Sequence, residues 1–161
     1  MPEVITNTTP IQYLHQLRLL HLLPEFYGTV HVPDLVVSEI MVGLKQGVDL
    51  PDPNGLDWLH IHPTAPNKWP LPSDIHRGEA AVLALAAEMK DPLLVLDDAA
   101  ARRYARSLAI PFTGTLGVLI RARRIGRIIS LSATLSHLDS LGFRLAPVTR
   151  LEALRLVGEQ D

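Results

Sequence analysis

An amide and two carboxylates stand directly behind apolar runs of this sequence. Asn7 follows the run "VIT" at 4–6, and Asp97 and Asp98 follow the run "LLVL" at 93–96. If both runs are strands of one parallel sheet, their carboxyl ends share the edge at which open α/β sheets place their ligands. We therefore expect these three side chains to face one crevice.

Two glutamates stand among residues that are expected to be buried. Glu39 is flanked by Val36 and Ile40 in a predicted helix, and Glu79 precedes the apolar stretch 80–85. A carboxylate on an apolar face is costly to bury unless it is paired or bound to a cation. Magnesium is a hard cation that takes oxygen ligands and is commonly held by one or two carboxylates. Such a site can orient a phosphodiester and generate a hydroxide for attack on phosphorus.

Each of these acids also has a purely structural interpretation. Asp98 and Glu79 fall near predicted helix N-termini, where negative charge is favourable. Taken singly, each is more simply explained as a cap or a solvated group. Only convergence of several acids in space distinguishes a site from a set of caps, and spacing alone does not prove convergence.

Strands and helices that would position these side chains alternate along the chain. Apolar runs at 4–6, 29–32, 93–96 and 110–112 are typical of parallel strands covered on both faces. Helical spacing of apolar residues predicts helices at 10–23 with a break near Arg18, 33–42, 76–89, 99–108, 116–125, 131–141 and 150–157. This alternation predicts an α/β fold with right-handed crossovers.

The segment 45–73 differs from the rest because it carries six of the 13 prolines. We interpret it as a long loop that contains one strand at 56–62. The two-residue period of a strand places Trp58, His60 and His62 on the same side. The two histidines could bind a metal, but no third ligand is nearby in sequence.

Composition limits the classes of protein to which the chain can belong. With 161 residues and 47% hydrophobic content, it suits one domain and is too short to make two domains a good expectation. No run approaches the roughly 18 to 20 apolar residues of a membrane helix, and the first residues lack the layout of a signal peptide. We therefore expect a cytoplasmic protein.

Several enzyme classes are excluded by missing residues or motifs. The chain has no cysteine, which excludes disulfides, zinc–thiolate sites, iron–sulfur clusters and cysteine nucleophiles. The glycine-rich fingerprints of dinucleotide and P-loop nucleotide binding are missing, and so is the Gly-x-Ser-x-Gly elbow of serine hydrolases.

A formal net charge of -2 argues against a protein that coats nucleic acid through bulk electrostatics. Arginine nevertheless occurs in two groups: Arg102, Arg103 and Arg106, and Arg121, Arg123, Arg124 and Arg127. The planar guanidinium pairs well with phosphate, although solvated helix faces often carry arginine for no further reason.

Five stretches of the sequence together resemble a known family: "TNTTP" at 6–10, "VPDLVVSEI" at 32–40, "RGEAAVLALA" at 77–86, "LLVLDDAAARRYA" at 93–105 and "FTGTLGVLIRARRIGRI" at 112–128. In this order they resemble the PIN domain, a superfamily of metal-dependent nucleases that includes VapC-type toxins. The likeness is greatest to the uncharacterised prokaryotic branch that has asparagine in its first motif. It covers roughly residues 4–147.

The resemblance implies a three-layer α/β/α, Rossmann-like fold with a central parallel sheet. It implies a single PIN-like domain over 1–161, with the proline-rich loop at 45–73 and a C-terminal extension at 148–161. It also implies a cluster of acidic residues that holds Mg²⁺ or Mn²⁺ at the carboxyl ends of the strands.

By position in the motifs, the four acidic sites fall on Asn7, Glu39, Glu79 and Asp98, with Asp97 as an adjacent metal-binding candidate. Hydroxyl side chains expected to shape the site are Thr8, Thr9 and Thr115, the last also a predicted helix cap. Asn7 departs from the family, because active PIN nucleases normally have aspartate there. An amide oxygen can touch a metal or its water but brings no negative charge, so divalent-ion affinity should fall.

The first functional hypothesis is a metal-dependent endoribonuclease, the toxin of a toxin–antitoxin pair. Glu39, Glu79 and Asp98 would hold the metal, and Asn7 would orient the attacking water. The resemblance implies products with a 3′-hydroxyl and a 5′-phosphate. The arginines assigned to the RNA backbone are Arg102, Arg103, Arg121 and Arg124.

Two other hypotheses remain open at this point. A PIN-like module without turnover would bind RNA or a protein partner and retain its acids as relics. A small-molecule-binding α/β domain rests on fold analogy alone. The expected partners are RNA, a small antitoxin whose amphipathic helix occupies an apolar groove and inserts a basic residue into the acidic site, and a second copy in a homodimer.

Overall fold

The computed structural model describes residues 2–64 and 73–160. In this part of the chain a five-stranded sheet has the order β3-β2-β1-β4-β5, and every neighbouring pair of strands is parallel. The strands are β1 (Glu3–Thr6), β2 (Val30–Pro33), β3 (Leu59–His62), β4 (Pro92–Val95) and β5 (Phe112–Thr113). The α-helices are α1 (Thr8–Gln16), α2 (Leu22–Tyr27), α3 (Asp34–Lys45), α4 (Arg77–Ala87), α5 (Ala99–Ser107), α6 (Thr115–Arg124), α7 (Leu131–Ser140) and α8 (Pro147–Leu156).

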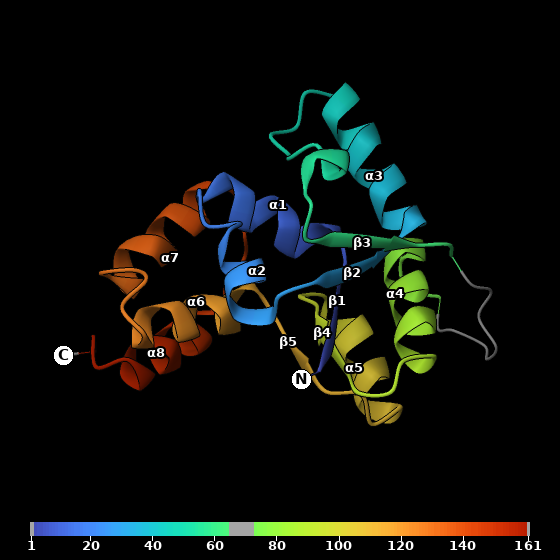
Figure 1. Cartoon of the computed structure of the whole chain (residues 1–161). Coiled ribbons are helices and arrows are strands. Elements are labelled where there is room, and N and C mark those ends of the chain that lie inside the picture. Colours follow the sequence, from blue (N-terminus) through green and yellow to red (C-terminus); the bar gives the residue numbers. More distant parts are fainter. Residues whose placement is uncertain (1, 65–72, 161) are drawn as a thin grey trace.

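Helices cover both faces of the sheet, which confirms the three-layer α/β/α arrangement (Figure 1). Helices α4 and α5 pack together on one side, and α6 contacts both α1 and α2 on the other. Helices α7 and α8 pack on α6 and each other at the outside of that second layer. The order of the strands places the carboxyl ends of β1 and β4 side by side. Residues that follow these two strands therefore meet at one edge.

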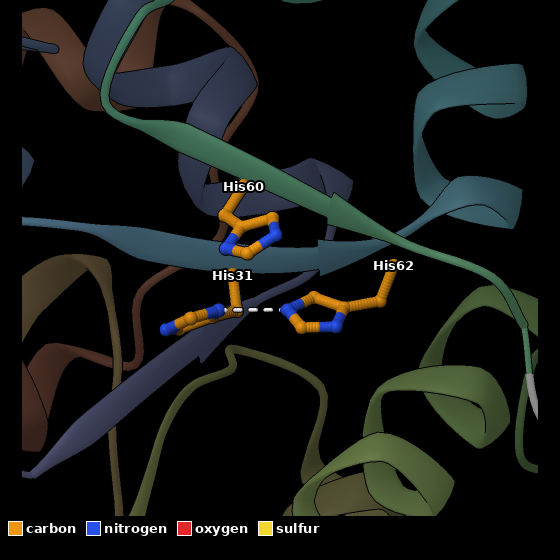
Figure 2. A group of neighbouring side chains, drawn as sticks. All are labelled: His31, His60 and His62. Carbon is orange, nitrogen blue, oxygen red and sulfur yellow. Dashed lines mark hydrogen bonds between the residues drawn. The ribbon is translucent and has the colours of Figure 1, made fainter.

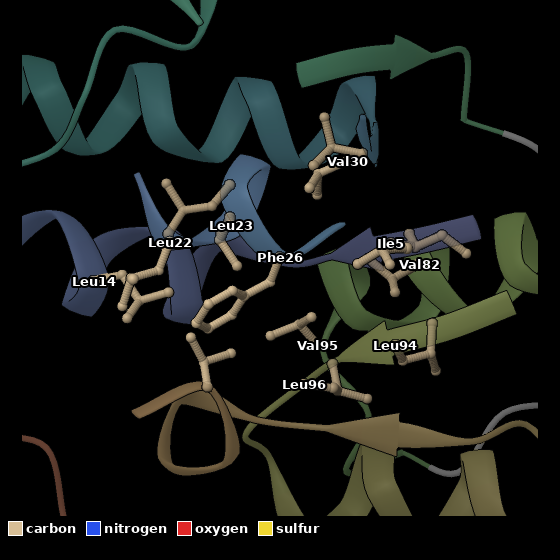
Figure 3. Packing of buried hydrophobic residues seen from close by; sticks show 14 of the residues in the cluster. Ile5, Leu14, Leu22, Leu23, Phe26, Val30, Val82, Leu94, Val95 and Leu96 are labelled. Atoms are coloured by element: carbon tan, nitrogen blue, oxygen red, sulfur yellow. The ribbon is translucent and has the colours of Figure 1, made fainter. Parts of the chain in front are cut away.

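Apolar side chains fill the space between the layers (Figure 3). The sheet contributes fully buried residues such as Ile5, Val30 and Leu94. Leu22 comes from α2 and Val82 from α4, and both are also fully buried. Side chains of the central strands are covered on both faces, which accounts for apolar runs without a strict alternation.

The helix predicted at 10–23 is two helices, and the predicted break is confirmed at Arg18. Its backbone φ is +64°, in the left-handed region, where no α-helix continues. Helix α1 ends before this residue and α2 starts after it. After this residue, α2 packs against β2 and α6.

Several predicted boundaries were wrong by a few residues. The strand predicted at 56–62 begins only at Leu59, after a short 3-10 turn (η1, Pro53–Gly55), so Trp58 lies outside it. The strand predicted at 110–112 is β5 at Phe112–Thr113. The helix predicted at 150–157 starts at Pro147, because proline is well suited to the first helical turn. Within the proline-rich segment, residues 65–72 lie outside the described part.

None of the helices in the described part of the chain has the length and apolar character that a membrane span requires.

Candidate active site

A cavity of about 610 Å³ lies at the carboxyl ends of β1 and β4. It is lined by side chains from the starts of α1, α4 and α5, from the middle of α3, and from the segment after α7: Asn7, Thr8, Thr9, Tyr13, Glu39, His76, Glu79, Asp97, Asp98, Gly142, Phe143 and Arg144. All four residues assigned to the acidic positions therefore meet at one cavity. The convergence that spacing could not prove is present in the structure.

Asn7 occupies the turn between β1 and α1 and is only 5% exposed. It stands at the N-cap position of α1, but its side chain does not cap the helix. Among residues 2–64 and 73–160, its Oδ1 atom has no hydrogen-bond partner. A buried oxygen in that state costs about 1–3 kcal/mol, so this one is suited to accept from a water or to face a cation.

Glu39 reaches the cavity from α3 and is oriented by a residue of α1. Thr8 Oγ1 donates to Glu39 Oε2 over 2.8 Å. A side chain at Gly78 would overlap the Glu39 carboxylate, so glycine there permits α3 to bring its acid against the start of α4. The hydroxyl predicted to shape the site thus positions one of the acids.

Glu79 takes part in a capping box at the start of α4. His76 N donates to Glu79 Oε1 over 3.3 Å, and Gly78 N donates to His76 Nδ1 over 3.3 Å. His76 Nδ1 also lies 3.5 Å from Glu39 Oε1. One ring nitrogen of His76 thus lies within reach of both the start of α4 and the Glu39 carboxylate.

Burial raises the pKa of Glu79 above its ordinary value, and the negative charge of Asp98 raises it further. The negative charge of Glu39 also raises the pKa of Glu79. The backbone hydrogen bond from His76 and the charge of the His76 ring lower it. Burial is thus the largest cause of the shift, and the repulsion from two neighbouring carboxylates adds to it. A divalent cation would relieve that repulsion.

Replacement of Glu79 by glutamine is expected to stabilise the metal-free protein at pH 7. Because the folded pKa of Glu79 is raised, protonation stabilises the fold below the ordinary glutamate pKa, and this contribution is lost as pH rises through the raised folded value. Glutamine keeps the capping acceptor without the charge. In EDTA, we expect Glu79→Gln and wild type to have similar Tm near pH 4, and the variant to be higher by about 2 °C or more at pH 7. Equal pH dependence of the two Tm values would contradict the crowding of charge.

Asp98 caps a helix and also lines the cavity. Its Oδ2 accepts from Ala101 N over 2.9 Å at the start of α5. The structural interpretation of this acid is therefore correct, and it does not exclude the functional one, because the same carboxyl group lines the cavity beside Glu79.

Asp97 is tied to the start of α6. Thr115 donates to it twice, from N to Oδ1 over 2.8 Å and from Oγ1 to Oδ2 over 2.6 Å. Burial raises the pKa of Asp97, while the bonds from Thr115 and the charge of Arg102 lower it. Both carboxylate oxygens are thus engaged within the protein, and the pair fixes the end of β4 to the N-terminus of α6.

The four arginines assigned to RNA do not line this cavity. Arg102 donates from Nε to the Leu96 carbonyl over 2.6 Å and lies over the Phe112 ring, and Arg103 pairs with Asp74 over 3.4 Å. Arg121 lies over the Phe26 ring, with its guanidinium carbon 4.3 Å from the centroid.

Arg121 is at the far edge of the sheet, beside residues that precede or begin β1 and β4: Pro2, Val4 and Leu93. Arg124 is exposed near the end of α6. Of the four, only Arg102 approaches the acidic residues, through Asp97.

Five residues that line the cavity were not predicted from the sequence: Tyr13, His76, Gly142, Phe143 and Arg144. Tyr13 and Phe143 make an edge-to-face contact with ring centroids 5.0 Å apart. The position of His76 just before a helix with glutamate at its third residue is a capping signal that could have marked it. No local signal marks Phe143 or Arg144, which reach the site because the chain passes it after α7.

The donor set fits a hard divalent cation. Asn7, Glu39, Glu79 and Asp98 all line the cavity and carry side-chain oxygens, the ligands that Mg²⁺ and Mn²⁺ prefer. Asn7 Oδ1 has no hydrogen-bond partner among the described residues, and burial together with the charges of Asp98 and Glu39 raises the pKa of Glu79, so a cation would be favourable beside both.

A family model described as the PIN domain matches residues 3–159 of the chain. The matched range contains every strand and helix of the described structure and all four residues at the acidic positions. No curated protein matches the chain, and no solved structure matches it.

Proposed function

The chain belongs to the PIN-domain family, a family of nuclease-like proteins that generally use divalent metal ions, and from this premise we propose that it is a metal-dependent endoribonuclease. The observation that supports the proposal best is the meeting of Asn7, Glu39, Glu79 and Asp98 at one cavity beside the carboxyl ends of β1 and β4. Asn7 and Asp98 share this edge because each follows a parallel strand, but Glu39 comes from the middle of α3 and is not a cap, so its presence here favours a site.

Glu39, Glu79 and Asp98 are the proposed ligands for Mg²⁺ or Mn²⁺. When bound, the ion supplies Lewis-acid polarisation of the scissile phosphodiester. Thr8 holds the Glu39 carboxylate in position through its hydrogen bond. The buried amide oxygen of Asn7 would accept a hydrogen bond from the attacking water and so orient it towards phosphorus.

Substrate contacts are proposed for the side of the cavity that α1 and the segment after α7 form. Arg144 is exposed at the cavity and can pair with a phosphate. Tyr13 and Phe143 both line the cavity, so their partly exposed rings could contact unpaired bases. A single-stranded RNA therefore suits the site, and cleavage would leave a 3′-hydroxyl and a 5′-phosphate.

We also propose that the protein is the toxin of a toxin–antitoxin pair that acts in the cytoplasm. A basic side chain of a small antitoxin would neutralise the acidic cavity in the same way as a cation. A homodimer is proposed as well, since α8 exposes Val148, Leu151 and Leu156, which a second copy could cover.

The proposal is tested by incubating the purified protein with a panel of single-stranded RNAs in Mg²⁺, Mn²⁺ or EDTA. We expect cleavage with either ion and none in EDTA, because three carboxylates without a cation repel the phosphate. Single-stranded DNA of the same sequences tests the choice of sugar. Products are mapped by their end groups.

The matched control is Glu88→Gln, which removes a carboxylate from the exposed end of α4, away from the cavity. It should cleave like wild type. Cleavage that persists in EDTA, or that Glu79→Gln leaves unchanged, would show that the nuclease activity does not come from this site.

A further inference from the structure

Three histidines from two neighbouring strands meet on one face of the sheet, outside the acidic cavity (Figure 2). His31 belongs to β2, and His60 and His62 belong to β3. The parallel register pairs His31 with His60, and His62 follows two residues later on the same face. His60 and His62 have no third ligand near them in sequence, and His31 of β2 provides one in the fold.

One ring nitrogen from each histidine can be chosen so that all three lie within 4.8 Å of one another. His31 Nδ1 and His62 Nε2 are 2.8 Å apart. Zinc–nitrogen bonds of about 2.0–2.1 Å in a tetrahedral site require ligand nitrogens about 3.3 Å apart. The separation of 2.8 Å is slightly below that value and the other two do not exceed 4.8 Å, so the three nitrogens lie near the spacing of a zinc site.

The electrostatic setting also suits a cation. Burial lowers the pKa of His31, and His62 and His60 lower it further, so the ring is held in the neutral form that offers a lone pair. The negative charge of Glu3 on β1 raises the pKa of His31 and of His62, so this carboxylate lies near enough to favour a bound cation. His60 is exposed, which leaves the cluster accessible from solvent.

We propose that His31, His60 and His62 form a second metal site, which binds one first-row transition ion of the zinc class and ties the edge strand β3 to β2. Imidazole nitrogen suits Zn²⁺, whereas the oxygen ligands of the acidic cavity suit Mg²⁺ or Mn²⁺. The two sites thus select different ions. The three histidines leave a fourth coordination position for water, as in open zinc sites.

The proposal is tested with untagged, chelator-treated protein titrated with Zn²⁺ in a calorimeter, and with Co²⁺ followed by its visible absorption. Wild type should bind one Zn²⁺ at the histidines, with a rise in Tm that grows with Zn²⁺ concentration. His60→Gln and His62→Gln should each weaken Zn²⁺ binding by at least about 10-fold. Loss of a hydrogen-bond partner that only orients a metal ligand already costs about 10-fold in metal affinity or more, and loss of the ligand itself should cost no less. His60 is exposed, so its variant tests the site even if His62→Gln does not fold.

His137→Gln is the matched control, because His137 is exposed on α7 outside the cluster. It should bind Zn²⁺ like wild type. Asp98→Asn should also keep this binding, which distinguishes the histidine site from Zn²⁺ in the acidic cavity. Absence of stoichiometric Zn²⁺ binding by wild type would overturn the proposal, and so would binding that His60→Gln leaves unchanged.

Discussion

Asp98→Asn is expected to lower the rate of RNA cleavage by roughly 100-fold or more while leaving the fold almost as stable as in wild type. Asparagine is as good an N-cap as aspartate, so its amide oxygen can still accept from Ala101 N. The substitution therefore removes the charge at the cavity and keeps the cap. Single-turnover cleavage in Mg²⁺ measures the rate, and urea unfolding in EDTA measures the stability, which should change by no more than about 0.5 kcal/mol.

Two further variants separate the roles of Asp98. Asp98→Ala removes cap and charge together and should lose about 1 kcal/mol of stability as well as the activity. Ser130→Ala removes the cap of another helix, α7, where Ser130 Oγ accepts from Ala133 N over 3.0 Å. It should lose similar stability and keep the activity. Full activity of Asp98→Asn would show that the Asp98 carboxylate has only a structural role.

Asn7→Asp is expected to tighten divalent-ion binding by about 10-fold or more, which corresponds to about 1.4 kcal/mol. The new carboxylate would stand where a buried amide oxygen now lacks a partner among the described residues, next to a group of acids that already raises the pKa of Glu79. Without metal it adds repulsion, so Tm in EDTA should fall. With Mn²⁺ it adds attraction, so the gain in Tm on adding Mn²⁺ should exceed that of wild type.

Asn54→Asp is the matched control, since it makes the same change at an exposed position outside the cavity. Its response to Mn²⁺ should equal that of wild type. If Asn7→Asp binds Mn²⁺ no better than wild type, Asn7 does not face the cation. If only Asn7→Asp cleaves RNA, the natural chain is a PIN-like module that binds without turnover.

The elements of the fold could be predicted from the sequence because they depend on local pattern. Apolar runs bounded by polar residues indicated the strands, and helical spacing indicated the helices, including the break at Arg18. Boundaries were less certain where proline or a short strand was involved, as at β3 and β5. The position of an acid directly after a strand also made the candidate site predictable, because parallel strands end at one edge.

Only the tertiary structure decided which side chains that are distant in sequence lie next to one another in the fold. Arg121 is in a motif that resembles the family pattern, yet it lies at the edge of the sheet opposite the acids, whereas Arg144 carries no local signal and lines the cavity. His31 joins His60 and His62 because β2 and β3 pair in one register. Periodicity assigns a residue to a face of its own strand or helix, but the neighbour across that face is set by strand order, register and helix packing, which arise from the whole core.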